Sequence, residues 1–244
     1  MTSLSSPSTS ALANSPLASS RQVLLVTAPD WASTTGELRR FERKSLAAEW
    51  RRVGDRVTIS LGKSGLAWGI GLHREVSVAG AAKREGDGCA PAGIFAITAL
   101  FGYAGPESNL AHAARLPYYA ATCDLKAIDD PLSRHYNQLV DQRCVDEIDW
   151  HSHEEMLRDD GRYATGALIA HNSEPPVPGA GSCIFLHVWQ SAGMPTAGCT
   201  ASNLADMTEI CAWLDGAALP LLVQLPQSEY RRFKDAWALP APAD

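Results

Sequence analysis

The chain has 244 residues, of which 45% are apolar and 20% charged, so it can bury a full hydrophobic core as one globular domain. Its formal net charge of -6 disfavours a nucleic-acid partner, because phosphate binding requires clustered Lys and Arg. No apolar run approaches ~18 residues, so the sequence predicts no membrane span.

The first twenty residues predict a disordered N-terminal tail. Residues 1–20 carry no charge and consist mainly of Ser, Thr, Ala, Pro and Leu, which supply too few bulky side chains to form a core. A secretory signal would need a basic region followed by a continuous apolar region, and residues 1–20 show neither.

Short strands bounded by turn residues dominate the chain up to residue 100. The alternating and apolar segments are residues 22–27, 56–61, 67–72 and 93–100. A turn at residues 63–65 precedes the third of them. This pattern predicts a mainly β fold, either a largely antiparallel β-sandwich or another β-rich sheet, with a few short helices.

Residues 104–165 differ from this pattern, since they are rich in Asp, Tyr, His and Pro and show little periodicity. A stretch of that length between strands is more often functional than idle, so we expect a loop-rich insertion over the active site. A short helix is predicted at residues 152–157, with Glu154 and Glu155 near its start.

The remaining elements follow the insertion. Strands are predicted at residues 166–171, 183–188 and 221–225. Between the last two, Ser202 is the predicted cap of a helix that carries apolar residues at helical spacing and ends by Gly216. The chain turns polar from Gln227, and residues 229–244 are predicted to form a loose C-terminal tail.

A histidine and a cysteine lie close together in the last third of the sequence. His187 ends an apolar strand, and Cys199 follows Gly198 in the segment Thr196-Ala197-Gly198-Cys199. Histidine is the usual base for a thiol nucleophile, and the predicted helix after Cys199 would place its positive end near a thiolate. The N–H groups of Gly198 and Cys199 are candidate oxyanion donors. The alternative is a strand-end His beside a buried Cys.

A second motif begins at Lys83 and reads Lys-Arg-Glu-Gly-Asp-Gly-Cys-Ala-Pro-Ala-Gly. Together with Thr-x-Gly-Cys at Cys199, it resembles the L,D-transpeptidase catalytic domain of the YkuD type, in the proteobacterial branch with Lys-x-Glu-Gly-Asp-Gly-x-x-Pro-x-Gly. The similarity runs from about residue 22 to residue 226 and includes Gly65-Leu66-Ala67-Trp68-Gly69, Asp129-Asp130-Pro131, Tyr136-Asn137, Trp150, Glu154, Met156, His171-Asn172 and Gly181-Ser182. It implies a YkuD-like β-sandwich over residues 21–228.

The resemblance also implies a reaction. Cys199 matches the nucleophile, which forms a thioester with the diamino acid of a peptidoglycan stem peptide and releases D-alanine. His187 matches the base, and the carbonyl of Val188 is a plausible orienter of its ring. A second amine, from the diaminopimelate side chain or from L-alanine, then completes the cross-link. No cofactor is implied, carbapenems are expected inhibitors, the chain is expected to be a monomer, and the substrate implies the periplasm.

The candidate substrate-binding residues each have a structural alternative. Lys83, Glu85 and Asp87 either recognise a zwitterionic diamino acid or pair with each other. In the insertion, polar and aromatic side chains either bind a peptide or sugar or hold the loop in place; they are Asp130, Tyr136, Asn137 and Trp150. Many family members carry a histidine where this chain has Ala197. His171 either occupies part of that space or is bonded to backbone, and Thr196 completes the set.

Four further possibilities remain at this point. His151, His153, His171, His187 and Cys199 could supply metal ligands, although their spacing is not typical of zinc sites. Of the six cysteines, Cys123 and Cys144 are the pair expected to form a disulfide in an oxidising compartment. Water in place of the acceptor amine would make the protein a carboxypeptidase or amidase. A wall-binding module without turnover is the non-enzymatic alternative.

Overall fold

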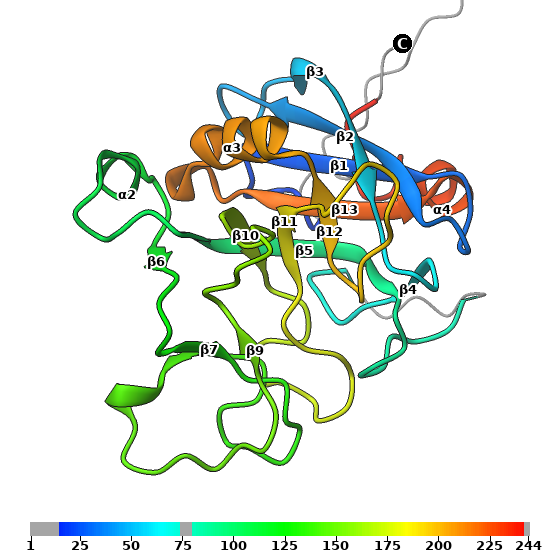
Figure 1. Cartoon of the computed structure of the whole chain (residues 1–244). Coiled ribbons are helices and arrows are strands. Elements are labelled where there is room, and N and C mark those ends of the chain that lie inside the picture. Colours follow the sequence, from blue (N-terminus) through cyan, green and yellow to red (C-terminus); the bar gives the residue numbers. More distant parts are fainter. Residues whose placement is uncertain (1–14, 74–79, 242–244) are drawn as a thin grey trace, which may run out of the picture.

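The fold is mainly β, as predicted, and its central feature is a closed barrel (Figure 1). The structure is a computed structural model that describes residues 15–73 and 80–241. Eight strands close in the order β10-β11-β12-β3-β2-β1-β13-β5, because β5 also pairs with β10. They are β1 (Gln22–Ala28), β2 (Thr35–Glu42), β3 (Arg51–Ser60), β5 (Ala90–Gly102), β10 (Thr165–Ile169), β11 (Phe185–Val188), β12 (Thr200–Ser202) and β13 (Leu221–Pro226).

The barrel replaces the expected sandwich of two sheets, and the length of β5 explains the difference. This strand has 13 residues. Its first half pairs with β13 over Gly93 to Ala96, and its second half pairs with β10 from Ile97 onward. One strand thus joins the two ends of the sheet, which removes exposed edges. Two short strands, β4 (Leu66–Trp68) and β6 (Tyr118–Ala120), add to β5 in parallel.

The main core lies where β1 and β13 run parallel to each other. Every residue of both strands is buried, which is why their sequences are nearly continuous apolar runs and do not alternate. Large side chains that are fully buried here include Leu24, Leu38, Ile59 and Phe95. This rigid body positions β11 and β12, from which the candidate site is built.

Helix α3 (Leu204–Trp213) packs against β10, β11 and β12 and buries Met207, Ile210 and Cys211, which confirms the predicted helix. Its predicted cap is wrong. Asn203 caps the helix by accepting the N–H of Asp206 at 2.9 Å, whereas Ser202 belongs to β12 and donates its hydroxyl to Thr58 O. The helix therefore starts beyond β12 and is not adjacent to Cys199.

The predicted C-terminal tail is wrong over its described part, because the chain returns to the core. Helix α4 (Gln227–Phe233) follows β13 directly, and Tyr230, Trp237 and Leu239 are buried. The ring of Phe233 stacks on Trp237 with a centroid separation of 4.3 Å. Residues 242–244 lie outside the described residues.

The predicted N-terminal tail is wrong in its last part as well. Leu17 is buried in the main core, and the hydroxyl of Ser15 donates to Trp237 O. Residues 15–17 therefore pack against the core and the segment that follows α4. The prediction for residues 1–14 lies outside the described residues.

The insertion has a small sheet of its own, below the barrel in Figure 1. Strand β7 (Leu125–Ala127) pairs with β8 (Leu139–Asp141) and β9 (Glu154–Glu155), and the short helices of the described chain are α2 (Asn109–Ala113), η1 (Gln142–Cys144) and η2 (Gly216–Ala218). The helix predicted at residues 152–157 is therefore wrong. Lys126 explains the strand, because its ammonium lies 2.6 Å from the Glu155 carboxylate across the β7–β9 pair.

A second apolar cluster joins the insertion to the outer face of the barrel. Met156 and Leu125 of the insertion pack with Phe101 of β5, Phe185 of β11 and the side chain of Cys199. The cysteine thus lies under the insertion. The predicted disulfide is not formed, because Cys123 and Cys144 are both exposed free thiols.

Candidate active site

Strand pairing brings Cys199 and His187 to the same face of the sheet. Strands β11 and β12 run parallel, with His187 opposite Ala201. Side chains alternate along a strand, so Cys199, two residues before Ala201, points to the same side as His187. Both residues line a pocket of about 180 Å³. The structure therefore places the thiol and the imidazole on one cavity.

The His187 ring is held as a neutral base. Its Nδ1 donates to the carbonyl of Val188 at 2.8 Å, in the tautomer that leaves Nε2 unprotonated. Burial lowers the pKa of His187 to about 4, an effect that the positive charge of Arg162 increases and the bond to Val188 opposes. At neutral pH the imidazole can therefore accept a proton.

The Cys199 thiol is also neutral. Its Sγ accepts the N–H of Phe185 at 3.3 Å and donates to the carbonyl of Cys183 at 3.5 Å. Burial raises the pKa of the thiol to about 12, and the Glu154 carboxylate adds to this rise. The expectation of a resting thiolate held by a helix dipole is wrong, because β12 separates Cys199 from the start of α3.

The turn before Cys199 is fixed by Thr196. Its Oγ1 donates to Cys199 O at 2.6 Å and accepts the N–H of Gly198 at 3.1 Å. Gly198 has a φ of +156°, and a Cβ there would lie 3.1 Å from Cys89 O. Since the Gly198 N–H is engaged, it is not an open oxyanion donor. Among the described residues, none accepts the Cys199 N–H.

Four further titratable side chains line this pocket, and the sequence did not single them out for chemistry. They are Glu154, Arg158, Arg162 and Tyr163. The ring of Tyr163 meets that of His187 edge-on at 5.3 Å, and its hydroxyl donates to the Glu154 carboxylate. The sequence pointed to this group of residues through Glu154, which belongs to the family resemblance. Residues 154–163 show no periodicity that would have indicated the others.

The charged residues of the Lys83 motif pair with each other and with the insertion. The Lys83 ammonium lies 2.7 Å from the Asp87 carboxylate. Glu85 accepts hydrogen bonds from the hydroxyls of Tyr136 at 2.5 Å and Ser182 at 2.7 Å. Lys83 and Asp87 thus pair with each other, which is the structural alternative stated for the motif. Glu85 links the motif to Tyr136 of the insertion and to Ser182, which precedes β11.

The predicted binding residues of the insertion are also engaged within the protein. Asn137 donates to His171 O at 2.8 Å and accepts the N–H of Cys183 at 2.9 Å. Asp130 accepts backbone N–H groups at 2.7 and 2.9 Å. Trp150 is buried against His135. Of the nine candidate binding residues, only Thr196 lines the pocket of Cys199.

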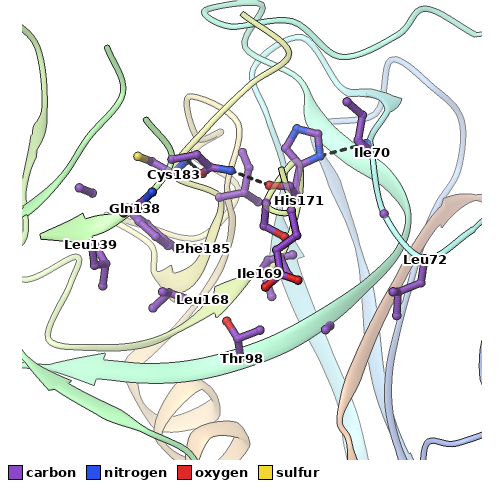
Figure 2. A pocket seen from close by; sticks show the side chains of 18 of the residues that line it. Ile70, Leu72, Thr98, Gln138, Leu139, Leu168, Ile169, His171, Cys183 and Phe185 are labelled. Carbon is purple, nitrogen blue, oxygen red and sulfur yellow. Dashed lines mark hydrogen bonds between the residues drawn. The ribbon is translucent and has the colours of Figure 1, made fainter. Parts of the chain in front are cut away.

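His171 bonds to backbone on both sides of its ring. Its Nδ1 accepts the N–H of Ile70 at 3.2 Å, which Figure 2 shows, and its Nε2 lies 3.0 Å from Ala180 O. Burial lowers its pKa to about 4. It belongs to a larger pocket of about 670 Å³, drawn in Figure 2, that shares no lining residue with the pocket of Cys199. The larger pocket also has a thiol and an imidazole, from Cys183 and His171, but both ring nitrogens of His171 are bonded to backbone. We place the candidate site in the smaller pocket because the Nδ1 bond of His187 leaves its Nε2 unprotonated.

Cys183 and Phe185 connect the two pockets. Both line the larger one, and their backbone groups hold the Cys199 sulfur.

No set of three His, Cys, Asp or Glu side chains within residues 15–73 and 80–241 could together hold a metal ion. Over the same residues, no helix has the length and apolar character needed to cross a bilayer.

No family model matches the chain, and no curated protein was found that matches it.

Proposed function

We propose that this chain is a peptidoglycan L,D-transpeptidase with a YkuD-like catalytic domain, in which Cys199 is the nucleophile and His187 the base. The observation that supports this most is a neutral imidazole, tied at Nδ1 to Val188 O, on the same pocket as a cysteine thiol. A base oriented by a third group beside a thiol is the arrangement of nucleophilic catalysis. The motifs at Lys83 and Cys199 provide the second line of support.

Acylation starts from the neutral pair. As Sγ of Cys199 attacks the carbonyl carbon between the diamino acid and the terminal D-alanine, Nε2 of His187 takes the thiol proton. The Cys199 N–H is the available donor for the resulting oxyanion. Collapse of the tetrahedral intermediate breaks the C–N bond, His187 gives its proton to the leaving amine, and a thioester remains.

Deacylation reverses the proton path. The amine of a second stem peptide attacks the thioester carbon, His187 accepts the amine proton, and the C–S bond breaks. The proton then returns to the Cys199 sulfur, which restores the neutral pair. Water in place of the amine would release a tripeptide stem by the same steps. The substrate places this reaction in the periplasm.

The test is turnover of a disaccharide-tetrapeptide, with products separated and sequenced by mass spectrometry. We expect the wild-type protein to release D-alanine and form a cross-linked dimer. Cys199→Ala should abolish both products, whereas Cys211→Ala, which removes a buried thiol on α3 outside the pocket, should retain them. Turnover that persists in Cys199→Ala would defeat the proposal.

A second assay examines the base. Carbapenems acylate the nucleophile of the family that this chain resembles, and the adduct is visible in the intact mass. His187→Ala should form little adduct over a period in which the wild-type protein reacts fully. Complete adduct formation in that variant would remove His187 from the mechanism.

A further inference from the structure

We propose that Arg162 binds the terminal carboxylate of the leaving residue, so that the enzyme selects stem peptides ending one residue beyond the bond it breaks. This inference rests on the proposed function and adds a specificity residue to it. It is carried by the position of Arg162, its unused donors, and the charge and size of the pocket.

Arg162 precedes β10 in the chain and lies beside the end of β11, the strand that carries the proposed base. Its carbonyl accepts the N–H of Val188 at 2.9 Å, so its backbone is one residue removed from His187. Its side chain lines the pocket together with Cys199 and His187. The positive charge of Arg162 also lowers the pKa of His187, as expected for a guanidinium near the ring.

The guanidinium of Arg162 has donors to spare. Asp160 is engaged by Arg158, which makes hydrogen bonds of 3.0 Å through Nε and 2.6 Å through Nη2. Nε of Arg162 lies 2.9 Å from the same carboxylate, but the N–H is not aimed at it, and this buried nitrogen has no hydrogen-bond partner. Two arginines thus share one aspartate, so these three side chains together carry one net positive charge.

The acidic side chain that lines the pocket, Glu154, is already bonded. Glu154 accepts the hydroxyl of Tyr163, and burial raises its pKa. Among the described residues it forms no ion pair with Arg162, whose carboxylate neighbour is Asp160. The pocket volume of about 180 Å³ is below the ~300 Å³ at which pockets for drug-sized ligands begin. A single small terminal residue fits such a pocket better than a longer peptide.

The test compares a disaccharide-tetrapeptide with its C-terminal carboxamide, which differs in charge but hardly in size. A hydrogen bond between the Arg162 guanidinium and a carboxylate is expected to raise kcat/KM for the free acid over the carboxamide by roughly 10- to 100-fold. Arg162→Gln should lose that factor on the acid and keep its rate on the amide. Arg143→Gln, which removes an exposed arginine of the insertion, should behave as the wild type.

The outcomes separate the two proposals. If the wild-type protein turns over neither peptide, the proposed function fails and the inference fails with it. If it turns over acid and amide equally well, or if Arg162→Gln slows both equally, only the inference is overturned. Alkylation of Cys199 by iodoacetamide, a neutral reagent, should be the same in wild type and Arg162→Gln, which shows that the site is intact.

Discussion

The protonation state of Cys199 gives the sharpest prediction, because the sequence and the structure disagree on it. A pKa of about 12 leaves ~1 thiol in 10⁵ ionised at pH 7, which is roughly 3000-fold fewer than for a cysteine with a pKa of ~8.5. Only the thiolate reacts with iodoacetamide at a useful rate. Cys199 should therefore be labelled slowly in the resting protein.

The assay follows alkylation of each cysteine by peptide mass spectrometry over a series of pH values. Cys123 and Cys144 are exposed and serve as internal standards. Free cysteine added to the same samples is the pH reference, and its labelling levels off above its ordinary pKa of ~8.5. The rate at Cys199 should continue to rise about tenfold per pH unit beyond that point.

The shape of the pH profile distinguishes ionisation from access. Burial alone would lower the rate at Cys199 at every pH but would still produce a plateau above an ordinary thiol pKa. A thiolate paired with a protonated His187 would give fast labelling that hardly changes between about pH 5 and 9, because the pKa of that thiol would lie well below the ordinary value of ~8.5. Either result would refute the neutral pair.

Three further predictions concern stability and the turn. His171 and His187 have a pKa of about 4 in the folded state and ~6.5 in the unfolded state. As pH falls, the unfolded state therefore takes up these protons before the folded state does, which lowers the free energy of unfolding. Acidification from pH 7.5 to 4.5 should cost ~2.5 kcal/mol per histidine in urea unfolding, and an unchanged midpoint would contradict this. Thr196→Val should lower kcat/KM by at least ~10-fold and the free energy of unfolding by ~1–2 kcal/mol, while Thr196→Ser retains both. Asn203→Ala should cost ~1 kcal/mol of stability, Asn203→Asp much less; equal losses would exclude the cap.

The sequence predicted strands best where apolar residues are contiguous. Strands β1 and β13 were found because burial on both faces makes their sequences apolar throughout. Strand β2 was missed because Arg39 and Arg40 interrupt its pattern. Both arginines are buried, and each is paired with a glutamate, Arg40 with one that lies on α3. A single sequence does not reveal a partner 169 positions away.

The tail and the insertion show how packing overrides local composition. Apolar residues of the C-terminal segment are spaced among charged ones, so no sequence pattern indicated that Tyr230, Trp237 and Leu239 are buried together. Glu154 and Glu155 suit the first turn of a helix, but the ion pair of Glu155 with Lys126 holds them in a strand. Local preference is worth less than such a tertiary contact.

The candidate site was predicted in its residue types but not in its electrostatics. The family resemblance paired Cys199 with His187, and both residues line one pocket. The thiolate expectation relied on a helix dipole, which contributes at most ~2 kcal/mol. Burial acts in the opposite direction and is larger, because a rise in pKa from 9.0 to about 12 corresponds to ~4 kcal/mol. How deeply a side chain is buried depends on the insertion packed over it, which the motif does not encode.

The neutral pair constrains when the proton can move. A thiol with a pKa of about 12 beside an imidazole with a pKa of about 4 favours the neutral pair over the ion pair. In the proposed mechanism, the proton transfer therefore accompanies formation of the C–S bond. The same burial that suppresses the thiolate strengthens each hydrogen bond offered to the oxyanion, including that from the Cys199 N–H. In the proposed mechanism, such a site protects its sulfur from small electrophiles at rest and activates it for an acyl group that reaches both His187 and that N–H.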